Sequence, residues 1–231
     1  MKAKNFIPVI LAAMTITAAG CSAEPEVWEY EIGNNTLINE ETAAFIEAIR
    51  PEAPIYANYL VESSALPSAV SLSYETNGVA VTMETYMVDL DEMVVTTITN
   101  GVTNDVILKD GTYYMVSDAE KTALYMNMTE EQQSAMIDAM VSSVQSAFNP
   151  ETASFETGKT EYNGTEYLYE KITTAEAGEI MIYADKKTKD VKYIQNAGQI
   201  MEINFLEHEI SDSIFEIPAD YTMTDMATMA G

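Results

Sequence analysis

Four tight-turn pairs constrain the fold of this chain more than any other feature. Each is an asparagine or aspartate followed by glycine, and they lie at Asn77-Gly78, Asn100-Gly101, Asp110-Gly111 and Asn163-Gly164. Such pairs favour two-residue hairpin turns, in which both central residues have positive φ angles. The segments around them alternate apolar and polar residues, as a strand with one wet face does. The sequence therefore predicts antiparallel strands joined as hairpins.

Two runs of such strands are predicted, with a helix between them. The first run covers residues 68–128 and the second covers residues 153–206, with a break near Gly158. Together they give about ten or eleven strands in hairpin order, which indicates an α+β protein built on an antiparallel sheet. No repeat of 20 to 50 residues is visible, so a solenoid or a propeller is not expected.

The helix between the two strand runs is predicted from Thr129 to Phe148. Thr129 is a good N-cap, and Gln132 completes a capping box with it. Asn149-Pro150 ends the helix, because proline pushes the preceding residue out of helical geometry. One apolar face recurs every four residues and consists of Met136, Met140, Val144 and Phe148. This face requires a partner surface, which a curved sheet could supply.

The charge of the chain excludes one class of partner. Its 231 residues include 11 lysines and arginines against 37 aspartates and glutamates, a formal charge of -26. Nucleic acid is not an expected partner, because phosphate binding relies on lysine and arginine. The acidity is interpreted as a solvated outer surface, with a cation-binding surface as the alternative.

The first 21 residues have the pattern of an export signal. Lys2 and Lys4 precede an apolar run over residues 6–16, which is shorter than the roughly 20 residues that cross a membrane. The run ends in Ala18-Ala19-Gly20-Cys21, which resembles the lipobox of bacterial lipoproteins. We therefore expect residues 1–21 to be a lipoprotein signal peptide, Cys21 to carry the lipid, and residues 22–38 to be a tether. A plain secretory signal with a free thiol is the alternative.

No residue cluster in the sequence indicates catalysis. Cys21 is the only cysteine, so no disulfide framework exists. His208 is the only histidine and lies between two glutamates, as a surface residue would. The carboxylates of Asp89, Asp91 and Glu92 could hold a calcium ion or form an exposed turn. The chain shows no phosphate-binding loop and no nucleophile elbow, and we expect neither an enzyme nor a cofactor or metal.

The end of the chain resembles a known family. The segment 211–221 reads SDSIFEIPADY, which resembles the Asp-x-x-Phe-x-Ile-Pro-x-x-Tyr ending of the LolA-like superfamily of lipoprotein carriers. The segments 162–167 and 182–185 fit its rhythm of a glycine turn, an aromatic strand and an aspartate turn. The resemblance implies one LolA-like domain over residues 39–225. Its fold would be a strongly bent antiparallel sheet, a half-barrel, with helices covering the concave face.

The same resemblance implies a function. A lipid, an acyl chain or another hydrophobic group would lie between the sheet and the helix face of Met136, Met140, Val144 and Phe148. The alternative is a closed core, in which case the protein would be a scaffold that binds another envelope protein. In both cases the expected location is the outer face of the cytoplasmic membrane, or the outer membrane of a two-membrane cell. Acylated Cys21 would hold the protein there.

Overall fold

The computed structural model describes residues 38, 40–133, 135–136, 152–174, 178–206 and 210–230. The chain divides into two compact units, which we describe separately. The described residues of Met1–Ala65 and Asp138–Ile203 belong to the first, here called the helical unit. Those of Leu66–Ile137 and Asn204–Gly231 belong to the second, here called the meander unit. The prediction of one LolA-like domain over residues 39–225 stays a prediction.

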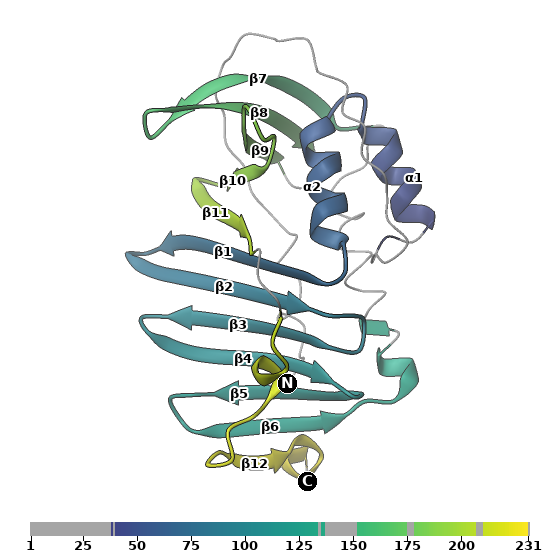
Figure 1. The fold of residues 1–231 in the computed structure, drawn as a ribbon, viewed down its shortest axis with the longest axis vertical. Helices are drawn as coiled ribbons and strands as arrows, with labels where there is room; N and C mark the ends of the chain where they lie inside the picture. Colours follow the sequence, from purple (N-terminus) through teal and green to yellow (C-terminus); the bar gives the residue numbers. More distant parts are fainter. Residues whose placement is uncertain are drawn as a thin grey trace. The chain divides into compact units, whose positions relative to one another are not determined.

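The meander unit is a sheet of hairpin-linked strands. In chain order these are β1 (Ser68–Thr76), β2 (Val79–Met87), β3 (Met93–Thr99), β4 (Val102–Lys109), β5 (Thr112–Ser117), β6 (Thr122–Asn127) and β12 (Thr222–Asp225). Their order across the sheet is β12-β6-β5-β4-β3-β2-β1 (Figure 1). The strands from β1 to β6 pair antiparallel with their sequence neighbours, which confirms the predicted meander.

Strand β12 differs from the others because it pairs with β6 in parallel. It does not return through a hairpin but follows residues 210–221, and Thr222 N–H donates to the carbonyl of Lys121 at 2.9 Å. The strand is absent from the sequence prediction, since four residues with a partner about a hundred positions earlier give no local periodic signal.

The predicted turns have the expected backbone geometry. Asn77 and Gly78 have φ angles of 52° and 76°, and Asn100 and Gly101 have 52° and 77°. Both residues of the other two pairs also have positive φ angles. Positive φ at both central residues is the geometry of a type I′ turn, whose twist matches that of the flanking strands. Local turn chemistry therefore fixes where these hairpins reverse.

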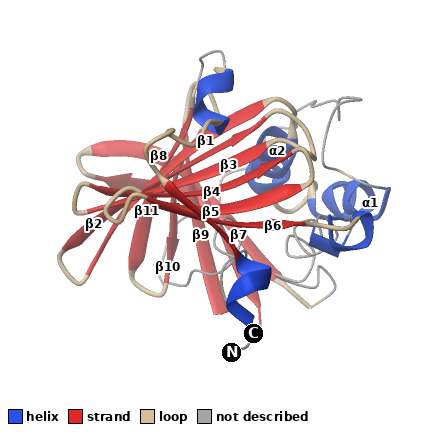
Figure 2. Cartoon of the chain, turned by 90° about the horizontal axis from the view of Figure 1, so that it is seen from below, coloured by secondary structure: helices blue, strands red, loops and turns tan. Residues whose placement is uncertain are grey.

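The helical unit joins two helices to a sheet. Its elements are α1 (Glu40–Ile49), α2 (Pro54–Ser64), β7 (Ser154–Tyr162), β8 (Thr165–Thr174), β9 (Gly178–Asp185), β10 (Val191–Asn196) and β11 (Gln199–Phe205). The strand order is β11-β10-β9-β8-β7. Helix α1 ends at Ile49, and helix α2 begins at Pro54. Strands dominate the described chain and helices are few (Figure 2), as in an open antiparallel α+β fold.

The two faces of this sheet carry different side chains. Ile172 of β8 is paired with Ile180 of β9, and both are buried, as is Ile182. Helix α2 contacts β8 and β9 and contributes the buried Leu60 to the core. Side chains on adjacent strand positions point to opposite faces, so the neighbouring Tyr169 belongs to the other face. On that face Tyr169 packs with Met181 and Tyr183 in a second buried cluster, so both faces of the sheet contribute to the core.

One predicted turn is wrong. Gly158 was expected to break the strand, yet it is buried within β7, directly opposite Tyr169 of β8. A glycine in a strand marks a position where another group approaches closely, and here an aromatic residue is its cross-strand partner. The residues around Gly158 therefore form one long strand instead of two short ones.

The start of the central helix has its predicted cap. Thr129 N–H donates to Gln132 Oε1 at 2.8 Å, and Gln132 N–H donates to Thr129 Oγ1 at 3.3 Å. These reciprocal bonds form the predicted capping box. Residues 130–133 and 135–136 are helical, and the rest of the predicted helix lies outside the described residues. No helix in the described ranges is long and apolar enough to cross a membrane.

Candidate functional site

One row of apolar side chains crosses five strands of the meander unit. Cross-strand register pairs Met87 with Met93, Met93 with Leu108, Leu108 with Tyr113, and Tyr113 with Met126. Directly paired residues of an antiparallel sheet place their side chains on the same face. The five residues therefore form a continuous line on one face from β2 to β6. We call this line the methionine row.

The face around the methionine row changes from apolar to polar along the strands. The next row is still mostly apolar and consists of Val70, Thr85, Val95, Val106, Met115 and Leu124. The row after that contains Thr97, Asn104, Ser117 and Thr122 from β3 to β6. The same row continues through the apolar Met83 of β2 and Leu72 of β1, so the face becomes polar only from β3 to β6.

Burial is deepest at the centre of the row. Met87 and Met93 are each 6% exposed and Leu108 is 2% exposed, whereas Tyr113 and Met126 are half-buried. Burial also raises the pKa of Tyr113, because the charged phenolate loses its hydration. Methionine side chains are flexible and polarisable, so they adapt to irregular apolar partners. The row consists of adaptable apolar side chains and contains no acid, base or nucleophile suited to catalysis at neutral pH.

The opposite face of the same sheet is covered by residues 210–221, which we call the closing segment. Its Phe215 is 5% exposed and packs against a cluster of Val94, Ile107, Val116 and Ala123. Two polar contacts hold the far end of the segment. Tyr221 O–H donates to Asp118 Oδ1 at 2.6 Å, and Asp220 forms an ion pair with Lys121. The residues that carry the family resemblance, 211–221, therefore pack against one face of this sheet.

A groove of about 330 Å³ lies beside the closing segment and is open to solvent. Its walls consist of Lys109, Tyr114, Phe215, Ile217, Pro218, Ala219, Tyr221 and Met223. Lys109 Nζ lies 5.5 Å from the centre of the Phe215 ring and 3.5 Å from Glu92 Oε1. Most of the lining is apolar, with one ammonium group. The sequence of the closing segment carries the family resemblance but no local signal of a groove.

Of the four predicted ligand residues, Met136 alone lies within the described ranges. Met136 is half-buried in the helical residues 135–136. Met140, Val144 and Phe148 lie outside the described residues, as do Cys21 and His208. The prediction that a helix face and the sheet enclose a ligand thus stays a prediction.

Glu170 is a buried carboxylate that the sequence analysis missed. It is 1% exposed, and its two oxygens accept hydrogen bonds from Ile55 N–H at 2.6 Å and Tyr56 N–H at 2.7 Å. These amides belong to the first turn of α2, where backbone N–H groups lack helical partners. Burial raises the pKa of Glu170 to about 8, although the two hydrogen bonds act in the opposite direction. The sequence signal that could have found Glu170 is its position in β8, where it lies between Leu168 and Ile172 on the inward face.

The acidic turn that could hold calcium uses one of its carboxylates internally. Asp89 Oδ1 accepts hydrogen bonds from Asp91 N–H at 2.8 Å and from Glu92 N–H at 2.9 Å. The Glu92 side chain lies toward Lys109. Within the described ranges, no group of three or more histidine, cysteine, aspartate or glutamate side chains is arranged to hold a metal ion.

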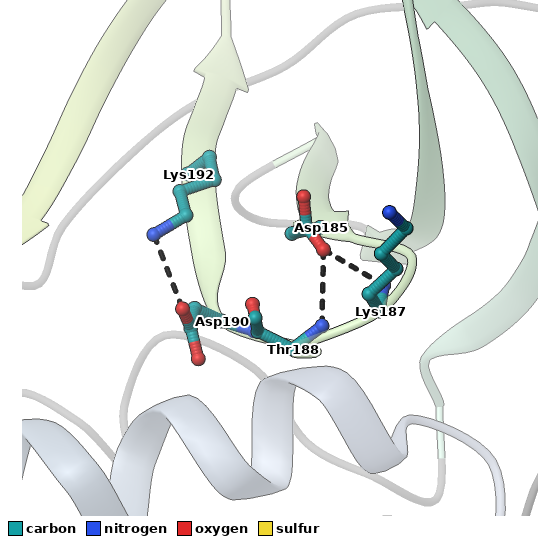
Figure 3. A network of polar contacts seen from close by, with 5 residues as sticks. All are labelled: Asp185, Lys187, Thr188, Asp190 and Lys192. Atoms are coloured by element: carbon teal, nitrogen blue, oxygen red, sulfur yellow. Dashed lines mark hydrogen bonds and ion pairs between the residues drawn. The ribbon is translucent and has the colours of Figure 1, made fainter.

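Four lysines are concentrated near the turn between β9 and β10. Asp185 Oδ1 accepts hydrogen bonds from Lys187 N–H at 2.7 Å and Thr188 N–H at 3.0 Å, which closes the predicted turn (Figure 3). Lys192 Nζ lies 3.2 Å from Asp190 Oδ2, and Lys186 Nζ lies 3.1 Å from Glu166 Oε1. Carboxylates thus accompany these lysines, and the turn is not a strongly cationic patch.

Comparisons with known proteins do not assign a family. No family model and no curated protein matches the chain. Among solved structures, an uncharacterized conserved protein from Thermus thermophilus is 7% identical, with 79% of this chain and 99% of that chain covered and a TM-score of 0.44. A LolA superfamily protein from Nitrosomonas europaea is also 7% identical, with 64% and 88% covered and a TM-score of 0.25. At these values neither likeness supports a functional argument.

Proposed function

We propose that the protein is a membrane-anchored bacterial lipoprotein with a LolA-like sheet that shelters hydrophobic groups at the methionine row. The bound group would be a lipid or the acyl chain of another lipoprotein. The observation that carries this proposal is the unbroken apolar line from Met87 on β2 to Met126 on β6. In this proposal the protein has no enzymatic activity.

The proposal also includes the predicted apolar face of the central helix. That face consists of Met136, Met140, Val144 and Phe148, so it is rich in methionine, as the row is. Flexible thioethers would accept chains of differing length and branching, since methionine repacks more readily than branched residues. The proposed specificity is therefore broad for the acyl chain.

A scaffold with a closed core is the second candidate function. The observation that favours it is the deep burial of Met87, Met93 and Leu108, which a filled core would also show. In that case the partner would be another envelope protein, bound at the outer surface. The two functions differ in whether a lipid copurifies with the chain.

Native mass spectrometry of the full chain, with organic extraction of bound lipid, tests the ligand. Met126→Trp adds bulk at the half-buried end of the row, while Met229→Trp makes the same change at a side chain that is 63% exposed. A stoichiometric lipid that Met126→Trp loses and Met229→Trp retains would support sheltering. A lipid-free mass that also takes up no added fatty acid or phospholipid would favour the scaffold.

The anchor is proposed from the sequence pattern around Cys21. Two acyl chains on this residue would hold the protein stably, because each buried CH₂ contributes about 0.8 kcal/mol. The protein would face outward from the cytoplasmic membrane or lie on the outer membrane of a two-membrane cell. Cys21→Ala should release the protein from salt-washed membranes, and a variant that stays bound would contradict lipidation.

A further inference from the structure

The groove beside the closing segment is a second candidate binding site. It lies on the sheet face that carries Ile107 and Tyr114, whereas the methionine row carries Leu108 and Tyr113. Adjacent residues of a strand point to opposite faces. A ligand in the groove would therefore be separated by the sheet from the acyl group of the proposed function.

The size and lining of the groove suit a small apolar tail. Its volume of about 330 Å³ is near the lower end of the roughly 300 to 1,000 Å³ found for small-molecule sites. Tyr114 and Phe215 supply aromatic walls, and Met223 remains 46% exposed at the lining. One short chain or one ring would fill this space, whereas a whole phospholipid would not.

The groove carries a positive charge, which is rare in the sequence of the meander unit. Lys109 and Lys121 are the only lysine or arginine residues in the sequence ranges 66–137 and 204–231. Lys121 is paired with Asp220, so Lys109 is the cation that lines the groove. Its side chain is 32% exposed, and its contact with Glu92 spans 3.5 Å. Partly exposed pairs of this kind contribute only about 0 to 1 kcal/mol, so an incoming anion can compete with Glu92.

We propose that the groove binds a small carboxylic acid with an apolar tail. The carboxylate pairs with the Lys109 ammonium, and the tail lies against Tyr114, Phe215 and Met223. The net charge of -26 repels anions at a distance, but at 0.15 M salt this repulsion is screened beyond about 8 Å while the direct contact persists. Binding should therefore improve from low salt to physiological salt.

Methyl NMR of the full chain, labelled at the methionine methyl groups, tests this proposal. Octanoate is titrated at 0.15 M salt and compared with its uncharged counterpart octanamide. Octanoate should shift the Met223 signal and bind about fivefold tighter than octanamide, which is the effect of one partly exposed charge pair. Equal affinities for the two compounds, or no shift of Met223, would overturn the proposal.

Three variants test whether the Lys109 ammonium, and not a general change in the protein, determines the preference for octanoate. Lys109→Met should abolish the preference for octanoate and retain octanamide binding, whereas Glu92→Gln should strengthen octanoate binding about threefold by removing the competing carboxylate. Lys159→Met, on β7 of the helical unit, is the matched control and should change neither affinity. An unchanged preference in Lys109→Met would refute the site. That result would leave the lipid extraction test of the methionine row unaffected.

Discussion

The carboxylate of Glu170 on β8 accepts a hydrogen bond from Tyr56 N–H at 2.7 Å, although the two residues are 114 positions apart in sequence. The second oxygen does the same for Ile55. One side chain thus satisfies two free amides at the start of α2 and fixes that helix on the sheet. Its burial makes this contact dependent on pH, because taking the carboxylate out of water favours its protonated form.

Stability should fall as pH rises through the pKa of Glu170. The folded-state pKa of about 8 is above the ordinary value of 4.5, so the proton is bound more tightly in the folded protein. The resulting stabilisation is complete below pH 4.5 and is lost as pH rises through 8. Between about pH 6 and pH 9 the wild type should lose roughly 2 to 3 kcal/mol relative to Glu170→Gln.

Urea denaturation of both proteins at several pH values measures this difference. Glu166→Gln is a suitable control, because Glu166 lies on the same strand but is exposed. Its stability should follow that of the wild type across the pH range. Parallel pH profiles for the wild type and Glu170→Gln would contradict the assignment.

Truncation of Met93 should destabilise the meander unit. Met93 is 6% exposed at the centre of the methionine row, and replacing a buried methionine by alanine costs about 2 to 5 kcal/mol. Met229→Ala removes the same atoms at a position that is 63% exposed and should cost less than about 0.5 kcal/mol. Chemical denaturation of the two variants gives both values. Similar small losses would mean that the centre of the row is loosely packed.

The start of the central helix should depend on Thr129. Thr129→Ala removes the hydroxyl that accepts from Gln132 N–H, and the loss of such a cap costs about 1 kcal/mol. Faster hydrogen exchange at Gln132 and Gln133 is expected, while Thr129→Ser should preserve most of the protection. Identical exchange in the alanine and serine variants would show that the cap does not stabilise this helix end.

Replacing Gly111, at the third predicted hairpin turn, should be unfavourable for two reasons. Gly111 has a φ of +71°, and an added Cβ would lie 2.8 Å from Gln133 Nε2. At Gly78, with a φ of +76°, an added Cβ meets nothing within 4 Å. Each alanine variant should lose about 1 to 2 kcal/mol from the left-handed backbone. Only Gly111→Ala should also break the 3.3 Å hydrogen bond from Gln133 Nε2 to Met128 O, which side-chain amide NMR would detect.

The parts of the fold that local chemistry determines were predictable from the sequence. The Asn-Gly and Asp-Gly turns, the strands of the meander and the Thr129 cap all depend on neighbouring residues, and the structure has them as expected. The predicted break at Gly158 was wrong, because the residues next to a glycine do not distinguish a turn glycine from a strand glycine that is buried opposite Tyr169. Its role is decided by the neighbouring strand.

The candidate sites were less predictable for the same physical reason. The methionine row depends on the register of five strands, which a list of methionines does not give. The groove depends on the closing segment lying across strands far away in sequence, so Phe215 and Lys109 meet only in the folded unit. Glu170 could have been noticed at its inward position in β8, but its partners on α2 could not.

The parallel pairing of β12 with β6 has a consequence for how the chain is made. The contact between Lys121 and Asp220 spans 99 positions, so the ribosome must release nearly the whole described chain before that strand can dock. Until then, β6 offers an unpaired backbone edge to any other extended chain. A chaperone that shields such edges during synthesis would therefore act on β6 until β12 has been made.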